Sequence, residues 1–111
     1  MIDEATFRRV SDRALESLKQ SLIAAEEEGG FEAEEKNGVL NVLFEDGAAK
    51  FVFTPQTPVR QIWISARTTS FKLEWSEAAE TFILPKSGEN LKALTERLLQ
   101  EQLDDPALQL P

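Results

Sequence analysis

The stretch FEAEEKNGVLNVLFEDGAAKFVF, residues 31–53, changes the hydrophobic period of the chain from helical spacing to alternation. Within Val39–Glu45 every second residue is apolar, and the alternation resumes over residues 49–53. A period of two is typical of strands that bury one face. The Asn37-Gly38 dipeptide favours a tight hairpin turn, and residues 45–47 supply the next turn. We therefore predict an antiparallel meander built around this stretch.

Further alternating segments follow, and Pro55 and Pro58 are expected to break the chain before the fourth strand. The complete set of expected strands is Phe31–Lys36, Val39–Glu45, residues 49–53, Arg60–Ala66, Ser70–Trp75 and Thr81–Leu84. The side chains expected to face the core are Leu40, Val42, Phe44, Phe51, Phe53, Ile62, Ile64, Ala66, Phe71, Leu73 and Trp75.

Helical patterns lie on both sides of these strands. From about Asp3 to Glu28 the apolar residues recur every three or four positions, with Asp3 as a plausible N-cap. The stripe of this first helix is Phe7, Val10, Ala14, Leu18 and Leu22. A closing helix is expected to begin after an N-cap at Ser87, to bury leucines as far as Leu103 and to end before Pro106.

Helix, strands and helix in this order predict an α+β fold in one domain, residues 1–111. The economical arrangement is a two-layer α/β sandwich. Two helices pack on one face of an antiparallel sheet of about six strands, and the other face stays in contact with water.

Composition excludes many functions. The chain has no Cys and no His, so it has no thiolate or imidazole for catalysis or metal binding. A formal net charge of −8 argues against nucleic-acid binding and favours cations or a basic protein surface. No apolar run reaches the length of a membrane span, and the acidic start lacks a targeting signal. We expect a cytoplasmic protein, or a mitochondrial-matrix protein if the chain is a processed organellar form.

The fourth strand places a tryptophan among polar residues. Because Ile62 and Ile64 must face the core, the alternate side chains face solvent. These are Gln61, Trp63, Ser65 and Arg67. Arg60 and Lys72 are candidates for positive charge near Trp63. An exposed tryptophan is a common anchor of protein interfaces. From the residues alone, the interface interpretation and its alternative are equally favoured. In the alternative, Trp63 only packs on the aliphatic stems of neighbouring side chains.

Carboxylates gather on the first helix and first strand. They are Asp3, Glu4, Asp12, Glu16, Glu26, Glu27, Glu28, Glu32, Glu34 and Glu35. If the helix packs beside that strand, they form a continuous negative ridge that attracts cations weakly and with poor selectivity. The alternative is a solvated charged face that only keeps the protein soluble. No pair of them specifies acid–base catalysis.

Several segments resemble the frataxin family, in order and over nearly the whole chain. They are residues 2–18, Asn37–Leu40, Gln56–Ser65, Phe71–Trp75 and the closing helix from Ser87. The segment QTPVRQIWIS, Gln56–Ser65, is the most specific of them. The resemblance implies the frataxin fold, which is the arrangement expected from the hydrophobic pattern.

The resemblance also implies two functional surfaces. Carboxylates at Asp3, Glu4, Asp12, Glu16, Glu32 and Glu35 would bind ferrous and ferric iron weakly. The outer sheet face around Trp63 and Gln61 would contact the cysteine desulfurase and the iron–sulfur scaffold protein. This sequence departs from the family in two places: Lys19–Ala25 lacks carboxylates that relatives carry, and Val59 replaces a frequent asparagine.

The resulting hypothesis is a non-enzymatic, iron-binding regulator of iron–sulfur cluster assembly. A ferroxidase with iron storage is the enzymatic alternative, and an acidic adaptor without a metal role is a third possibility. We expect a monomer, and oligomers formed with iron remain an open alternative.

Overall fold

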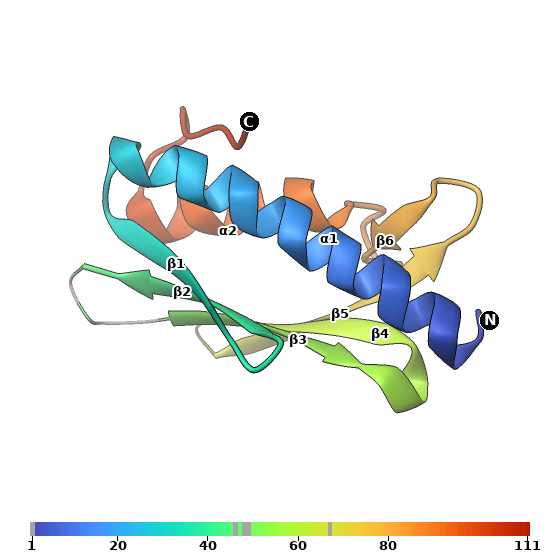
Figure 1. Cartoon of the computed structure of the whole chain (residues 1–111). Helices are drawn as coiled ribbons and strands as arrows, with labels where there is room; N and C mark the ends of the chain where they lie inside the picture. The colour runs from blue at the N-terminus through green and yellow to red at the C-terminus, as the bar shows by residue number, and fades with distance from the viewer. Residues whose placement is uncertain (1, 46, 48–49, 67) are drawn as a thin grey trace.

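In the computed structural model of the chain, the described residues form two helical rods that cover one face of a twisted sheet (Figure 1). The structure describes residues 2–45, 47, 50–66 and 68–111, and for Glu28 the backbone alone. The elements are α1 Glu4–Ala25, the 3₁₀ turn η1 Glu26–Glu28, β1 Phe31–Lys36, β2 Val39–Phe44, β3 Lys50–Gln56, the 3₁₀ turn η2 Thr57–Val59, β4 Gln61–Ala66, β5 Thr69–Ser76, β6 Thr81–Ile83 and α2 Leu91–Leu103.

The sheet is the predicted meander. Its strands lie in the order β1-β2-β3-β4-β5-β6, and each is antiparallel to the next. Asn37 and Gly38 both have positive φ, 55° and 79°, which suits a two-residue hairpin between strands with a right-handed twist. The predicted α+β sandwich is thereby confirmed. Asp46 and Ala49, on which part of the second turn and third strand was predicted, lie outside the described residues.

The core lies between the sheet and the helices. The predicted inward residues of β2, β3 and β4 are all buried, as is Leu73 of β5. From α1, Phe7, Leu18 and Leu22 are buried as predicted. Trp75 packs edge-on against Phe82, with ring centroids 5.3 Å apart, and stays half-buried. One-sided burial of the strands therefore follows the alternation in the sequence.

Pro55 does not break the chain as predicted, because β3 continues through it to Gln56. Pro55 lies opposite Ile62 of β4, beyond the last residue of β3 that pairs with β2. On that side β3 is an edge, where a residue without an N–H is tolerated. The break comes at η2, which begins at Thr57 and includes Pro58.

Ser87 is not the N-cap of the closing helix. Asn90 takes this role, and its side-chain oxygen accepts a hydrogen bond from the Ala93 amide at 2.7 Å. The Ser87 hydroxyl oxygen instead accepts from the amide of Glu89 within the preceding loop, at 3.2 Å. At the first helix the predicted cap is correct, since Asp3 accepts from the Thr6 amide at 2.7 Å. α1 itself ends at Ala25 and continues as η1.

The segment after α2 packs back onto the helices. Leu108 and Leu110 are 2% and 6% exposed. Gln100 of α2 donates to the Leu108 carbonyl, and Ser21 of α1 donates to the Pro111 carbonyl, each at 2.8 Å. This tail therefore ties the end of the chain to both helices. Among the described residues, neither α-helix is long and apolar enough to cross a membrane.

We expect Leu110→Ala to lower the free energy of unfolding by about 2 kcal/mol, because it removes a buried side chain and leaves a cavity. Chemical denaturation followed by circular dichroism measures this loss. Gln109→Ala is the matched control, since Gln109 is the exposed neighbour in the same tail. Equal stability of the two variants would contradict the packing of the tail.

Arg97 of α2 should make stability depend on pH. Its guanidinium donates twice to Glu89, at 2.7 and 3.0 Å, and these hydrogen bonds lower the pKa of Glu89 below its ordinary 4.5. The unfolded state then takes up a proton at higher pH than the folded state. The stabilisation is therefore present above the ordinary pKa and is lost as pH falls through the folded-state pKa.

We thus expect Arg97→Gln to lower the melting temperature more at about pH 7 than at about pH 2.5. Thermal melts of the variant and wild type at both pH values measure the difference. Lys92→Gln, an exposed change on the same helix, controls for net charge. A deficit of equal size at both pH values would show that the ion pair with Glu89 is not its source.

Candidate functional site

Trp63 lies near the middle of the sheet face that the helices leave uncovered. Its strand, β4, is flanked by β3 and β5, and its direct cross-strand neighbours are Thr54 and Lys72. Gln61 and Ser65 share its face, while Ile62 and Ile64 on the opposite face are fully buried. The predicted orientation of Trp63 is thus present in the structure, although the side chain is half-buried rather than fully exposed.

Polar contacts hold the Trp63 indole in place. Its Nε1–H donates to Oε1 of Gln61 at 2.7 Å, and Nε2 of Gln61 donates to Oε2 of Glu74 at 3.2 Å. Both ends of the Gln61 amide are therefore used, which fixes its orientation. On the ring face, Nζ of Lys72 lies 4.9 Å from the ring centroid, a distance typical of a cation–π contact. The indole is presented in a defined position.

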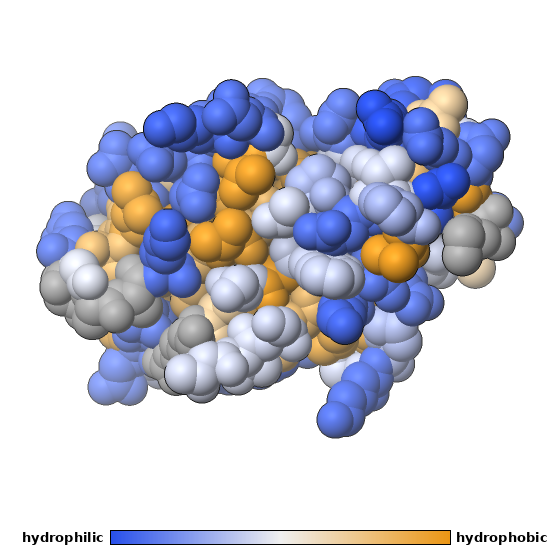
Figure 2. Space-filling model, turned by 90° about the horizontal axis from the view of Figure 1, so that it is seen from below, coloured by the Kyte–Doolittle hydropathy of each residue, from blue (hydrophilic) through white to orange (hydrophobic). Residues whose placement is uncertain are grey.

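Apolar side chains also lie on the sheet face of this tryptophan. Val39, Leu43 and Val52 belong to the outward-facing positions of β2 and β3 and are half-buried. Figure 2 shows this face from below, with hydrophobic side chains across its middle and hydrophilic ones around them. An apolar surface with a polar rim is typical of a protein-binding face.

Arg60 does not supply the positive charge expected beside Trp63. It precedes β4 in a left-handed conformation, with φ 56°, at the end of η2. Its guanidinium donates to the main-chain carbonyls of Ile2 and Thr57, so it ties the loop to the start of α1. Of the two cations considered, Lys72 is the one in contact with the indole. Arg67 lies outside the described residues.

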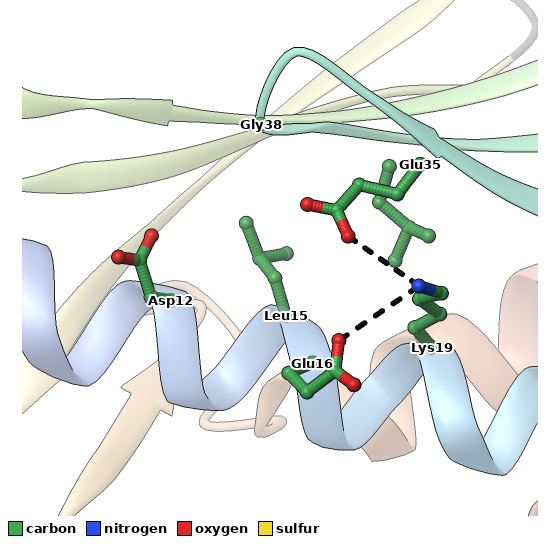
Figure 3. A pocket seen from close by; sticks show the side chains of 7 residues that line it. Asp12, Leu15, Glu16, Lys19, Glu35 and Gly38 are labelled. Carbon is green, nitrogen blue, oxygen red and sulfur yellow. Dashed lines mark hydrogen bonds and ion pairs between the residues drawn. The ribbon is translucent and has the colours of Figure 1, made fainter.

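On the other side of the molecule, α1 and β1 enclose a hollow of about 300 Å³ (Figure 3). Asp12 and Glu16 line it from α1 and Glu35 from β1. Lys19 lies between the carboxylates. Its Nζ is 3.4 Å from Oε1 of Glu35 and 4.0 Å from Oε2 of Glu16. Carboxylates of the helix and of the strand thus line the same hollow, as expected, and the ammonium group of Lys19 lies between two of them.

The acidic ridge is not continuous, contrary to the prediction. Glu32 and Glu34 share a strand face, as expected, but they pair with Leu43 and Asn41 on the outer face of the sheet. Phe31, Ala33 and Glu35 occupy the face towards the helices. Alternation along β1 therefore separates Glu32 and Glu34 from the carboxylates of α1.

The remaining carboxylates near the helix ends have local roles. Glu26 is half-buried, and its Oε1 accepts the Ala33 amide at 2.7 Å. Asp3 caps α1, and hydrogen bonds from Thr6 lower the pKa of its carboxyl group. Glu4 forms an ion pair with Arg8 at 3.4 Å. Glu27 is exposed, and the side chain of Glu28 lies outside the described part of the chain.

Comparison with known proteins agrees with this fold. A family model described as a frataxin-like domain matches residues 1–105. The chain belongs to the frataxin family. The family predicted from the sequence is thereby confirmed.

Among its curated relatives, the "Iron-sulfur cluster assembly protein CyaY" of Pseudomonas fluorescens strain Pf-5 is 33% identical over 103 residues, which cover 93% of this chain and 91% of the relative. The protein of the same name from Azotobacter vinelandii is 31% identical over 106 residues, 94% of this chain and 92% of the relative. A frataxin from Psychromonas ingrahamii has the same fold, with a TM-score of 0.71, 16% identity and 93% coverage of each chain.

Two residues of this frataxin contribute to the surfaces although the sequence did not single them out as site residues. Glu74 anchors Gln61 and through it Trp63. Its place on the outer face follows from the alternation of β5, but the contact depends on the register with β4. Lys19 follows Glu16 by one helical turn, a spacing that favours an ion pair. Its second partner, Glu35, comes from a strand whose position the helix pattern does not give.

The donors of this frataxin suit loosely held cations. They are carboxylate oxygens, which favour hard cations, and none of the described residues form a group of three or more ligands able to hold a metal ion. Carboxylates divided between two faces also give no support to the paired iron sites that a ferroxidase requires. The geometry favours electrostatic attraction of hydrated ions over direct ligation.

Glu26 has a contact that can be tested directly. Ala33 is on the edge strand, and its amide points away from β2 to the Glu26 carboxylate. We expect Glu26→Ala to speed amide exchange at Ala33 about fivefold, because one hydrogen bond contributes about 1 kcal/mol. Hydrogen exchange followed by NMR measures the rate. Glu27→Ala has the same charge change without the bond, and a similar acceleration in that control would contradict the assignment.

Proposed function

We propose that this frataxin acts in iron–sulfur cluster assembly as a non-enzymatic binding protein, which docks on the cysteine desulfurase and the scaffold protein through the outer face of its sheet. The curated relatives support the process, since they are named for iron–sulfur cluster assembly. The observation that carries the docking surface is Trp63, held by Gln61, Glu74 and Lys72 on the face that the helices leave uncovered.

The fixed position of Trp63 suits a docking role. A side chain that is already ordered loses little conformational freedom on binding, so more of its contact energy becomes affinity. Tryptophan is also enriched among the residues that dominate binding energy. On the same sheet face, Val39, Leu43 and Val52 add apolar surface that a partner would cover.

The carboxylates would guide the partner to this face. Glu32 and Glu34 lie on the same side of the sheet as Trp63, three strands away. Neighbouring strands are about 4.8 Å apart, so these charges lie about 14 Å from the strand of Trp63. A basic patch on the desulfurase would be attracted to this acidic edge, which speeds encounter and sets orientation.

Iron has a secondary place in this proposal. The exposed carboxylates of α1 and β1 would attract ferrous and ferric ions weakly, as hydrated ions shared among several groups. Bound cations would reduce the negative charge that faces a basic partner. Iron would thereby weaken the attraction to the desulfurase rather than take part in a reaction on this chain.

The test is binding and cluster assembly with the cognate desulfurase and scaffold. We expect Trp63→Ala to weaken binding about thirtyfold or more, because an anchor of this kind contributes about 2 kcal/mol. The effect of this frataxin on the rate of cluster assembly should be lost in the same variant. Ile23→Ala is the control, since it truncates an exposed apolar side chain on α1, in the helix layer. If Trp63→Ala folds and binds as the wild type does, the outer face is not the docking surface.

A further inference from the structure

Two hollows on the flank of α1 that faces away from the hollow of Figure 3 form a single groove. The first, of about 520 Å³, lies between α1 and the end of β5 with β6, and the second, of about 250 Å³, lies between α1 and the start of α2. Figure 1 shows α1 passing both β6 and α2. Three lining residues belong to both hollows, namely Ala14, Ser17 and Thr81. We call this continuous depression the α1–β6 groove.

The α1–β6 groove is positively charged on a chain whose formal net charge is −8. Arg9 and Arg13 line it from α1, and Lys92 lines it from the first turn of α2. Glu80 is the single carboxylate among the described lining residues, so the groove has a net charge of +2. None of the three cations has an ion-pair partner within the described part of the chain. Their charges are therefore available to an external anion.

The dimensions of the groove suit an extended peptide. Its lining on α1 runs from Thr6 to Ser21, which corresponds to about 22 Å along the helix axis. An extended chain covers that length with about seven residues. Arg9 and Arg13 are four positions apart, about 6 Å along the axis, and alternate side chains of an extended chain are about 6.6 Å apart. Two carboxylates separated by one residue would therefore reach both guanidinium groups, whose planar shape matches a carboxylate.

The groove also has apolar surface between its charges. Val10 and Trp75 line it and are half-buried, and the Trp75 ring packs edge-on against Phe82. This surface can contact the apolar side chains of a peptide, whereas a small inorganic anion would leave it uncovered. A nucleic acid is disfavoured because the net charge of the chain repels a long polyanion. A short acidic segment meets chiefly the local charge, since exposed charges are screened over about 8 Å at physiological salt.

We propose that the α1–β6 groove binds an acidic, extended segment of a partner protein, about seven residues long, with carboxylates at alternate positions. Arg9 and Arg13 bind two of these carboxylates, and Lys92 attracts a third near the start of α2. This contact is separate from the docking face around Trp63, because Trp75 and the groove lie on the helix side of the sheet. This frataxin then has two contact surfaces, an aromatic one beside carboxylates and a basic one for an acidic segment.

The experiment is titration of a labelled peptide, Gly-Glu-Leu-Glu-Ser-Glu-Gly, with this frataxin at low ionic strength, followed by fluorescence polarisation. We expect Arg13→Gln to weaken binding about threefold and the double variant Arg9→Gln with Arg13→Gln about tenfold, because each exposed ion pair contributes up to a factor of about five. Arg8→Gln is the matched control. It makes the same change on the same helix, but Arg8 pairs with Glu4 at 3.4 Å and does not line the groove.

The reverse change should strengthen binding. Glu80→Gln removes the carboxylate of the groove, and we expect it to tighten binding of the peptide about threefold, because it removes repulsion of like charge. Glu77→Gln is its control, since Glu77 is exposed in the same turn but is not among the residues that line the groove. Equal gains in the two variants would show that only the net charge of the chain matters and would overturn the proposal.

A second peptide of the same composition, Gly-Glu-Glu-Leu-Ser-Glu-Gly, has no two carboxylates at alternate positions and should bind more weakly. Equal affinity for both peptides would overturn the proposed recognition of an extended segment. Displacement of the first peptide by inorganic tripolyphosphate more readily than by unlabelled peptide would identify a phosphate site instead and overturn it too.

Backbone NMR locates the bound peptide. We expect shift changes centred on Thr6, Arg13 and Thr81, and changes centred on Trp63 would contradict the proposed position. Circular dichroism establishes that each variant folds. The Trp63 docking proposal is tested with the desulfurase and scaffold and does not depend on this result.

Discussion

Each strand of the meander has to bury one face under α1 and α2, and this one-sided burial is the constraint on which the other features depend. In β4 it forces Ile62 and Ile64 fully into the core, where they are 0% exposed. Trp63 between them then has to face outward. A slip of one residue in the register would bring Gln61 and Ser65 into the core, which is strongly unfavourable. The orientation of the proposed docking face is therefore fixed by the same packing that stabilises the fold.

Much of this architecture could be predicted because its signals are local. Alternation, the Asn37-Gly38 turn and the Asp3 cap each depend on residues a few positions apart. The two errors have tertiary or competing causes. Pro55 is tolerated because the pairing of β3 with β2 stops at Phe53, so no β2 residue needs a hydrogen bond from position 55. No local sequence pattern reveals where this pairing stops. Ser and Asn are both favoured N-cap residues, so the sequence pattern alone does not separate Ser87 from Asn90. In the structure Asn90 is the N-cap, and it also forms an antiparallel β-bridge with Ile83.

For the candidate site, the sequence predicts which sheet face each residue lies on. It does not predict the contacts between the residues. The face of Trp63 follows from alternation, but the hydrogen bonds through Gln61 to Glu74 require the register between β4 and β5. Arg60 is one residue from Gln61 in sequence, yet its left-handed backbone directs the guanidinium to the start of α1. The carboxylates were found from composition, while their division between two faces depends on where α1 crosses β1.

The division of the carboxylates between two faces changes how the net charge of −8 acts on an approaching molecule. A partner does not meet the sum of the charges, because screening limits each exposed group to about 8 Å. On the helix side, Lys19 and Ala33 already engage Glu16, Glu35 and Glu26. Glu32 and Glu34 face outward with Trp63. The outward-facing carboxylates of β1 and the indole of Trp63 thus belong to one surface, so in the proposed docking a basic partner attracted by the carboxylates would arrive beside the indole.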